Sequence, residues 1–483
     1  NMQKESKGLS AWQLTMMALG TVIGGSFFLG SAVGIHAAGP SIIISYILGG
    51  VLVYLILFAL SEMTVANPDA GSFRTFAAQA FGPGTGFVVG WVYWTGMILA
   101  LSSEATAISI LVRQWVPGIS IGYLGGFIII GVTVLNLLGA DKLSKLESSL
   151  AAIKLLAIVS FIVLALLLII GAFPGTRAVG LGVLTREPWL PAGIKGIAGS
   201  MLVVLFAYAG FEIIGLAASE TANPGKTVPK AIRNTVFGLV GLYILSVVAL
   251  LPLITTAALS EKVSPLVAAL SRQGMGWAGT AINFILITAI LSTMLAAMFG
   301  LGRMIRSLAD EELAPKWLDD DKDVPYRGIL FSGFAMLVGL GLGLLLPRVY
   351  LFLVSSGGFA ILFTYALIMA THIRFRRQNG CPPAGQCQIP GYPYTSWIGL
   401  ISLIIAMASM PLVSGQASGL ITGVAIVFFY SVIYLVMKHW GVFAENAADT
   451  ILVNKKFNPI TVRQFAMEIA EGVTDKEKEK TED

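Results

Sequence analysis

The chain has 483 residues, of which 56% are hydrophobic and only 12% are charged, and its mean hydropathy is +0.82. This balance leaves too little polar surface for a water-soluble protein. It is typical of polytopic membrane proteins, in which runs of about 20 apolar residues cross the bilayer. The net charge of +5 does not indicate a nucleic-acid partner, because the Lys and Arg residues gather between the apolar runs.

Apolar runs separated by turn residues predict an all-α membrane protein with twelve transmembrane helices. In chain order the expected spans are 11–37, 41–66, 86–115, 121–138, 149–171, 196–217, 234–256, 279–305, 328–347, 349–373, 395–414 and 418–440.

Twelve spans place both termini on the same side of the membrane. Most of the 31 Lys and Arg residues fall in segments on that side, which identifies it as the cytoplasm by the positive-inside rule. We therefore expect a multi-pass protein of the cell membrane with cytoplasmic tails at 1–10 and 441–483. The second tail ends in a mixed-charge run and reads as a solvated segment.

The apolar run of the first span contains a glycine-rich stretch between residues 20 and 28, where Gly24 and Gly25 are adjacent. Adjacent glycines destabilise a helix interior, and each freed backbone group costs several kcal/mol in hydrocarbon unless another group satisfies it. Unwound membrane helices line cavities, and the N–H groups at the start of a half-helix can receive a carboxylate. The interruption therefore predicts a ligand site.

The sixth span is also interrupted by glycine, at Gly210 and Gly215 on either side of Glu212. Interruptions in the first and sixth segments predict an inverted five-plus-five repeat, over 11–171 and 196–373, with a substrate site between the halves. The alternative is that these glycines serve close helix packing. Helices eleven and twelve, at 395–440, lie outside the repeat and are free to contact a small membrane partner or a second copy.

These stretches resemble the amino acid/polyamine/organocation superfamily, and within it the bacterial amino acid transporter family most. The resemblance covers nearly all of spans one to ten. It rests on residues 20–28, 67–73, 90–117, 206–224 and 302–315. It implies the leucine-transporter-like fold with helices one and six broken. It also implies a bacterial secondary active amino acid transporter, a permease and not an enzyme.

The resemblance further implies the residues that bind the substrate. Backbone amides of helix one would hold the carboxylate, and carbonyls near the break in helix six would help to hold the ammonium. Phe206 would be the aromatic gate, since its ring face attracts a cation and its closure excludes water. The implied binding residues are Thr21, Val22, Ile23, Gly24, Gly25 and Ser26, then Phe206, Ala207, Tyr208, Ala209 and Gly210, with Met97, Ala100, Leu101, Glu104 and Ser292 around the substrate side chain.

Three charged residues fall inside predicted spans: Lys154, Glu104 and Glu212. A charge in the membrane costs at least a few kcal/mol, so each needs a partner or a function. The resemblance implies that Lys154 contacts the break in helix one and, in proton-coupled members, exchanges a proton. The alternative for Lys154 is snorkelling to the inner interface. Glu104 and Glu212 either couple protonation to transport or act as structural partners.

The pocket residues are mostly apolar, which favours a neutral amino acid carried in symport with a proton. Exchange of amino acids, with Lys154 as a permanent structural cation, is the first alternative. Glu104 leaves open a cationic substrate, and a sensor that binds without transport is a further alternative. No catalytic constellation or cofactor motif indicates an enzyme. The expected partners are an amino acid, a proton and the lipid bilayer.

The two cysteines, Cys381 and Cys387, lie in a polar loop that the topology places in the cytoplasm. That compartment keeps thiols reduced, and neither His nor further Cys residues are close enough in sequence to complete a zinc site. We therefore expect two reduced thiols and no metal.

Overall fold

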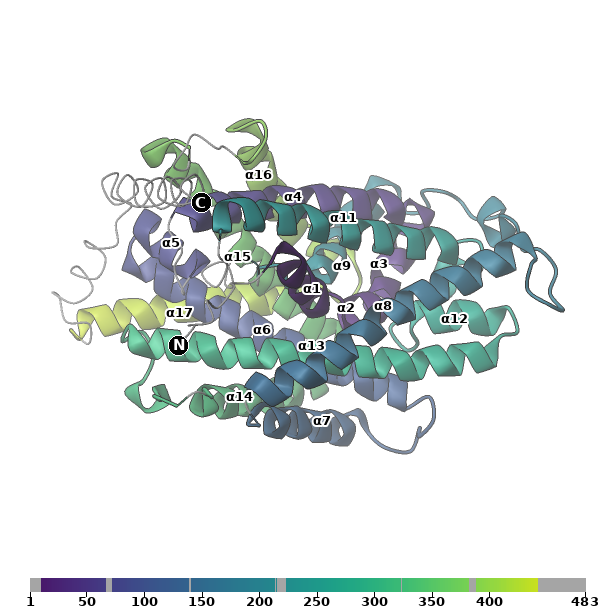
Figure 1. Ribbon diagram of the computed structural model, residues 1–483, viewed down its shortest axis with the longest axis horizontal. Coiled ribbons are helices and arrows are strands. Elements are labelled where there is room, and N and C mark those ends of the chain that lie inside the picture. The colour runs from purple at the N-terminus through teal and green to yellow at the C-terminus, as the bar shows by residue number, and fades with distance from the viewer. Residues whose placement is uncertain are drawn as a thin grey trace, which may run out of the picture.

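The computed structural model describes residues 10–66, 72–138, 140–212, 214, 223–322, 324–381 and 388–441. Within these residues the chain is helical and has no strand. The long helices α4 (Ile42–Ala66), α11 (Pro224–Leu250) and α13 (Gly276–Asp310) run along the longest axis of the molecule, with α1 (Ala11–Val22) and α9 (Gly193–Tyr208) near its middle (Figure 1).

The first apolar segment forms three helical pieces instead of one. Helix α1 is followed by α2 (Gly25–Phe28) and α3 (Ser31–Ala38), with non-helical residues at 23–24 and 29–30. Gly24 has an extended backbone, with φ −158° and ψ −155°, so the α1 hydrogen-bond ladder stops before it. The interruption predicted between residues 20 and 28 is therefore present.

The remaining elements complete the described part of the chain. They are η1 (Gly39–Ser41), α5 (Phe73–Phe81), α6 (Pro83–Val112), α7 (Ile121–Asn136), α8 (Ala140–Ile170), η2 (Gly182–Thr185), η4 (Thr256–Ala258), α12 (Pro265–Arg272), η5 (Lys316–Leu318), α14 (Tyr326–Leu344), α15 (Val349–Asn379), α16 (Tyr394–Ala408), η7 (Met410–Leu412) and α17 (Ala417–His439).

Several helices extend beyond the predicted spans. Helix α8 begins at Ala140 instead of 149, and α11 begins at Pro224 instead of 234. Hydropathy marks only the apolar part of a helix, whereas the helix itself continues into water through charged residues such as Lys230 and Arg233. Helices α5 and α12 were not predicted, because each is too short to produce a membrane-length apolar run.

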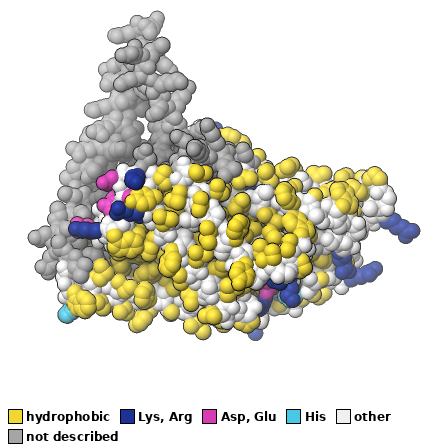
Figure 2. Space-filling view, turned by 90° about the horizontal axis from the view of Figure 1, so that it is seen from below, with side chains coloured by type: hydrophobic (Ala, Val, Ile, Leu, Met, Phe, Trp, Pro, Cys, Tyr) yellow, Lys and Arg dark blue, Asp and Glu magenta, His cyan; other side chains and the backbone are white. Residues whose placement is uncertain are grey.

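Eight helical stretches in the described part of the chain are long and apolar enough to cross a membrane, and α7, α9 and α16 are apolar but shorter. Figure 2 shows hydrophobic side chains over most of one face, with charged side chains in a few small groups. These features confirm a multi-pass membrane protein that is helical, without strands, in the part of the chain that the structure describes. The number of twelve spans and the inverted repeat stay predictions.

Helices α6 and α15 cross at close range in the core because small residues face each other. A Cβ atom on Gly357 would lie 3.0 Å from the backbone N of Ala100 and 3.0 Å from the carbonyl of Gly96. A Cβ on Gly96 would in turn lie 2.8 Å from that of Ala360. Small residues at such crossings let two membrane helices pack backbone to backbone. This crossing fixes the positions of the polar side chains that α6 and α15 carry.

One end of the bundle is where α4 ends and α5 begins (Figure 1). Buried charged side chains connect α4 to α15 there. The Glu62 carboxylate lies 2.7 Å from Nε2 of His372 and accepts a hydrogen bond from Arg376 at 3.0 Å. The backbone N–H groups of Gln388 and Ile389 also donate to Glu62, each at 2.8 Å. Glu62 therefore joins α4 to α15 and to the segment that precedes α16.

Cys381 is disulfide-bonded, so the expectation of a reduced thiol is wrong at this position. That expectation rested on the redox state of the compartment inferred from topology, which does not determine whether two sulfur atoms lie within bonding distance. Cys387 lies outside the described residues.

Candidate functional site

The break between α1 and α2 exposes a backbone N–H at Gly25, the first residue of α2. The first N–H groups of any helix have no acceptor within that helix. Here the carboxylate of Glu104, on α6, accepts the Gly25 N–H at 2.8 Å, and Glu104 itself is buried. A Cβ on Gly25 would lie 2.8 Å from that carboxylate oxygen and 3.1 Å from the Cβ of Ala107. Only glycine leaves room for this contact.

Lys154 on α8 satisfies the opposite side of the same break. Its ammonium donates to the carbonyl of Gly20 and, at 2.8 Å, to the hydroxyl of Thr293 on α13. That hydroxyl donates in turn to the carbonyl of Ile23 at 2.8 Å. Lys154 is only 1% exposed, so the snorkelling alternative is wrong: its side chain points into the break and not to the membrane surface.

The sixth predicted span is interrupted where α9 ends at Tyr208. Ala209 is extended, with ψ 151°, and Gly210 has φ +108°, a left-handed conformation that favours glycine. The N–H of Gly210 donates to the carboxylate of Glu212 at 3.2 Å. Of the two alternatives for Glu212, its geometry fits a brace that holds the broken helix.

Two tyrosine hydroxyls complete the surroundings of Glu212. Tyr93 on α6 donates to it at 2.6 Å, and Tyr365 on α15 donates at 2.7 Å. With the Gly210 N–H, the carboxylate receives three hydrogen bonds, one from α6, one from α15 and one from its own segment after α9. These hydrogen bonds connect the segment after α9 to α6 and to α15.

The two interruptions lie against each other. A Cβ on Gly210 would be 3.1 Å from the carbonyl oxygen of Thr21, so the end of α1 contacts the break after α9. The predicted residues Val22, Ile23, Ser26, Phe206, Ala207 and Tyr208 are all buried around this junction or on its helices. The residues of both predicted breaks are therefore brought together by the tertiary structure.

Some backbone carbonyls at the junction already have hydrogen-bond donors. Tyr243 on α11 donates to the carbonyl of Ala207 at 2.9 Å, and Tyr350 on α15 donates to the carbonyl of Gly25 at 3.0 Å. The ring of Tyr243 also stacks on Phe27, with centroids 4.1 Å apart. These tyrosines hold the broken segments in place.

The remaining predicted pocket residues lie on α6 and α13. Ala100 lies at the crossing of α6 with α15, Met97 is half-buried, and Leu101 is buried. Ser292 is fully buried, and its hydroxyl has no hydrogen-bond partner among the described residues. The adjacent Thr293, not Ser292, contacts the first break.

The set of predicted site residues omitted Thr293 and the tyrosines that hold the breaks: Tyr93, Tyr243, Tyr350 and Tyr365. Hydroxyl groups within apolar spans were the available signal, because a buried hydroxyl needs a partner. That signal is weak, since such residues are common in membrane helices and their partners lie far away in the sequence.

Two interrupted apolar helices that meet inside a helical membrane protein, with side chains satisfying their freed backbone groups, define the architecture of a membrane transporter with discontinuous helices. The chain belongs to the amino acid permease family, because the model of that family matches residues 13–450. The resemblance inferred from the sequence is confirmed.

Relatives similar to the chain over most of its length have the same family character. An uncharacterized amino acid permease, YvbW of Bacillus subtilis (strain 168), is 33% identical over 90% of this chain and 98% of its own. The gamma-aminobutyric acid permease of the same organism is 30% identical over 95% of this chain and 97% of its own. The aromatic amino acid transport protein AroP of Escherichia coli O157:H7 is 30% identical over 85% of this chain and 91% of its own. These relatives are transporters and not enzymes.

Proposed function

We propose that the protein is a secondary active transporter that carries a neutral amino acid together with a proton. It would alternate between outward-open and inward-open states of a twelve-helix, leucine-transporter-like fold with both termini in the cytoplasm. The observation that carries this proposal is the hydrogen bond from the Gly25 N–H to the buried Glu104 carboxylate.

The Gly25 N–H is one of the amides expected to hold the substrate carboxylate. Two carboxylates cannot share one N–H donor at close range, because their negative charges repel in a low-dielectric site. The substrate therefore competes with Glu104 for this amide. A proton taken up by Glu104 removes its negative charge, so the substrate carboxylate can replace it on Gly25.

This competition couples the two ligands. A proton from the outer solution and the substrate enter together, and after the carrier opens inward both leave to the cytoplasm. Glu104 then returns to Gly25 as a carboxylate, which restores the arrangement described here. Such coupling requires only that the proton and the substrate stabilise the same state of the site.

The substrate ammonium would bind backbone carbonyls at the second break. Ala207 already accepts from Tyr243, so the carbonyls of Tyr208 and Ala209 are the better candidates in that stretch. Phe206 would close over the bound substrate, with Met97, Leu101 and Ser292 beside its side chain. The relatives named for gamma-aminobutyric acid and for aromatic amino acids support a substrate with a carboxylate, an ammonium and an uncharged remainder.

Lys154 would act as a fixed cation that holds the first break while the helices move. It bonds α1 through Gly20 and α13 through Thr293 at once. Its ammonium would also supply the positive charge that a metal cation bound between α1 and α13 would otherwise supply. We therefore expect transport that does not depend on sodium.

Uptake of a labelled amino acid mixture into sodium-free proteoliposomes, with and without an inside-alkaline pH gradient, tests the proposal. Accumulation that requires the gradient in the wild type and is lost in Glu104→Gln is the expected result. Gradient-independent uptake that requires preloaded amino acid would show exchange instead. Binding without any uptake would show a sensor, and uptake of Lys or Arg alone would show a cationic substrate.

A further inference from the structure

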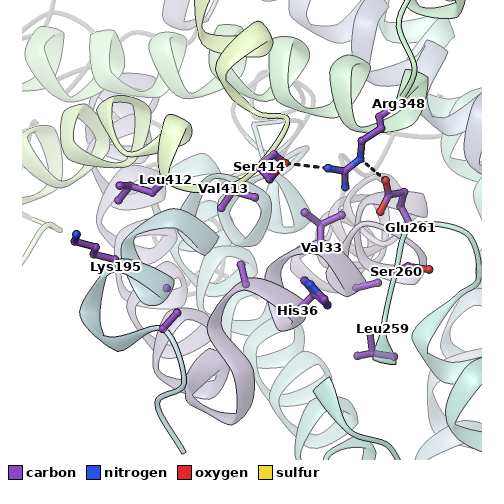
Figure 3. A pocket seen from close by; sticks show the side chains of 14 residues that line it. Val33, His36, Lys195, Leu259, Ser260, Glu261, Arg348, Leu412, Val413 and Ser414 are labelled. Atoms are coloured by element: carbon purple, nitrogen blue, oxygen red, sulfur yellow. Dashed lines mark hydrogen bonds and ion pairs between the residues drawn. The ribbon is translucent and has the colours of Figure 1, made fainter. Parts of the chain in front are cut away.

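A cavity lies away from the helix breaks, at the end of the bundle that holds α12. It has a volume of about 500 Å³ and lies between α3, the start of α9 and the loops before α12, α15 and α17 (Figure 3). This volume is within the range of small-molecule sites. Its walls include α3, which follows the first break, and the start of α9, which precedes the second. In the proposed topology both lie on the outer side of the membrane, and we call this space the outer cavity.

One end of the cavity holds two opposite charges side by side. Nε of Arg348 donates to Glu261 at 2.6 Å, and Nη1 donates to the carbonyl of Ser414 at 3.0 Å (Figure 3). The Arg348 side chain is 42% exposed, so the pair lies open to water. A guanidinium has five N–H groups, and a carboxylate has about four acceptor positions, so both partners can bind a ligand while they stay paired.

The rest of the lining is mostly apolar, with His36, Ser260 and Lys195 as further polar side chains. Val33, Leu259, Leu412 and Val413 form apolar wall, while Lys195 is exposed at the far side in Figure 3. Arg348 is balanced by Glu261, and the Lys195 charge is additional. The cavity therefore attracts a carboxylate, offers an acceptor for an ammonium nearby, and accommodates an uncharged side chain.

We propose that this cavity is a second amino acid site, in which Arg348 binds the α-carboxylate and Glu261 the α-ammonium of a zwitterionic amino acid. The adjacent charges match the short separation of the two groups in such a ligand. The inference rests on the proposed function, since it makes the cavity the place where the substrate is captured before it reaches the helix breaks.

Protection of an introduced thiol tests this proposal on the full chain in membranes. Ser260, an exposed residue of the cavity wall, is replaced by Cys and labelled with a membrane-impermeant maleimide, with the unsubstituted protein as background. A mixture of the free proteinogenic amino acids, added before the maleimide, should occupy the cavity and slow labelling of Ser260→Cys. Adding Arg348→Gln should raise the concentration needed for protection by about tenfold or more, because a charge-assisted contact is lost.

Three further variants separate the outer cavity from the helix breaks. Arg186→Gln, which removes an exposed cation outside the lining, should leave protection unchanged, and Glu261→Gln should weaken it as Arg348→Gln does. Gly25→Leu blocks the inner site by contact with Glu104, and should abolish uptake but keep protection.

The outcomes distinguish this inference from the proposed function. Protection that disappears with Gly25→Leu and persists in both Arg348→Gln and Glu261→Gln would overturn the outer site while transport stands. Absence of protection in a protein that takes up amino acids would overturn it equally. Protection without any uptake would support the outer site and overturn the transport proposal.

Discussion

The carboxylate of Glu104 accepts a hydrogen bond from the backbone N–H of Gly25 at 2.8 Å, across 79 positions of sequence. The contact places a buried acid on the first N–H of the half-helix that follows the first break. Helix N-termini favour anions because their N–H groups are unpaired and the helix dipole is positive there. In the proposed function, Glu104 competes with the substrate carboxylate for this N–H group.

Replacing Glu104 with Gln should uncouple uptake from the pH gradient. The amide keeps an acceptor for Gly25 but cannot take up or release a proton. We expect gradient-driven accumulation to fall by about tenfold or more, the equivalent of about 1.4 kcal/mol, with exchange less affected. Uptake into proteoliposomes with and without the gradient measures this. Glu312→Gln, on the segment after α13, is the control, and an unchanged gradient dependence in Glu104→Gln would contradict the coupling role.

Adding a methyl group at Gly25 should impair the site more than it impairs the fold. In Gly25→Ala the new Cβ meets the Glu104 carboxylate at 2.8 Å and Ala107 at 3.1 Å, so the break must shift. We expect uptake to fall by about tenfold or more. Gly241→Ala on α11 is the matched control, because a Cβ there meets nothing within 4 Å. Equal uptake by the two variants would show that transport does not need the close contact between Gly25 and Glu104.

Removing the ammonium of Lys154 should lower both the stability of the protein and its uptake of substrate, because the first break loses the cation that holds it. Lys154→Ala leaves the Gly20 carbonyl and the Thr293 hydroxyl without this donor in a buried place. We expect a loss of about 1–3 kcal/mol in stability, measured as a lower melting temperature in detergent, and a loss of gradient-driven uptake. Lys154→Arg, which keeps the charge, should retain more of both. Uptake and melting temperature that are both unchanged in Lys154→Ala would refute the role of this ammonium in holding the first break.

Arg74 is expected to stabilise the end of the bundle at which α5 begins. Its side chain is 2% exposed, and it donates to Glu311 at 2.7 Å and to Ser307 at 2.9 Å. Arg74→Ala should lower stability by about 2 kcal/mol, since two charged hydrogen bonds between α5 and the end of α13 are lost. Thermal unfolding in detergent measures the change. The exposed Arg233 on α11 provides the control, and a similar melting temperature for Arg74→Ala and Arg233→Ala would disprove the prediction.

The Arg348–Glu261 pair should persist in mildly acidic solution. Burial opposes ionisation of Glu261, but the hydrogen bond and charge of Arg348 outweigh it and lower the pKa of this carboxyl below its ordinary value. A carboxyl with a lowered pKa in the folded protein contributes stability that is complete above its unfolded pKa and is lost as the pH falls through the folded pKa. The difference in melting temperature between the wild type and Glu261→Gln should therefore stay constant down to about pH 5. It should shrink only at lower pH, and a difference that disappears near neutral pH would show that the pair does not form.

Much of the fold was predictable from local patterns. Apolar runs predicted the helices, because a bilayer requires apolar residues over a fixed length. Adjacent glycines predicted the first interruption, because they destabilise a helix in any tertiary context. Helix ends were less predictable: α8 and α11 continue through polar residues that hydropathy assigns to loops. Helices α5 and α12 were missed for a related reason, since short helices depend on tertiary contacts more than on their own composition.

The sequence by itself determined that the chain spans a membrane, that the first and sixth apolar segments are interrupted by glycine, and that Glu104, Lys154 and Glu212 lie within apolar runs and need partners. Only the tertiary structure decided which partners these are: Gly25 for Glu104, Gly20 and Thr293 for Lys154, and Gly210 with two tyrosines for Glu212. The reason is physical. Burying a charge in hydrocarbon demands a partner of some kind, which composition can reveal, but the choice of partner depends on how distant helices pack.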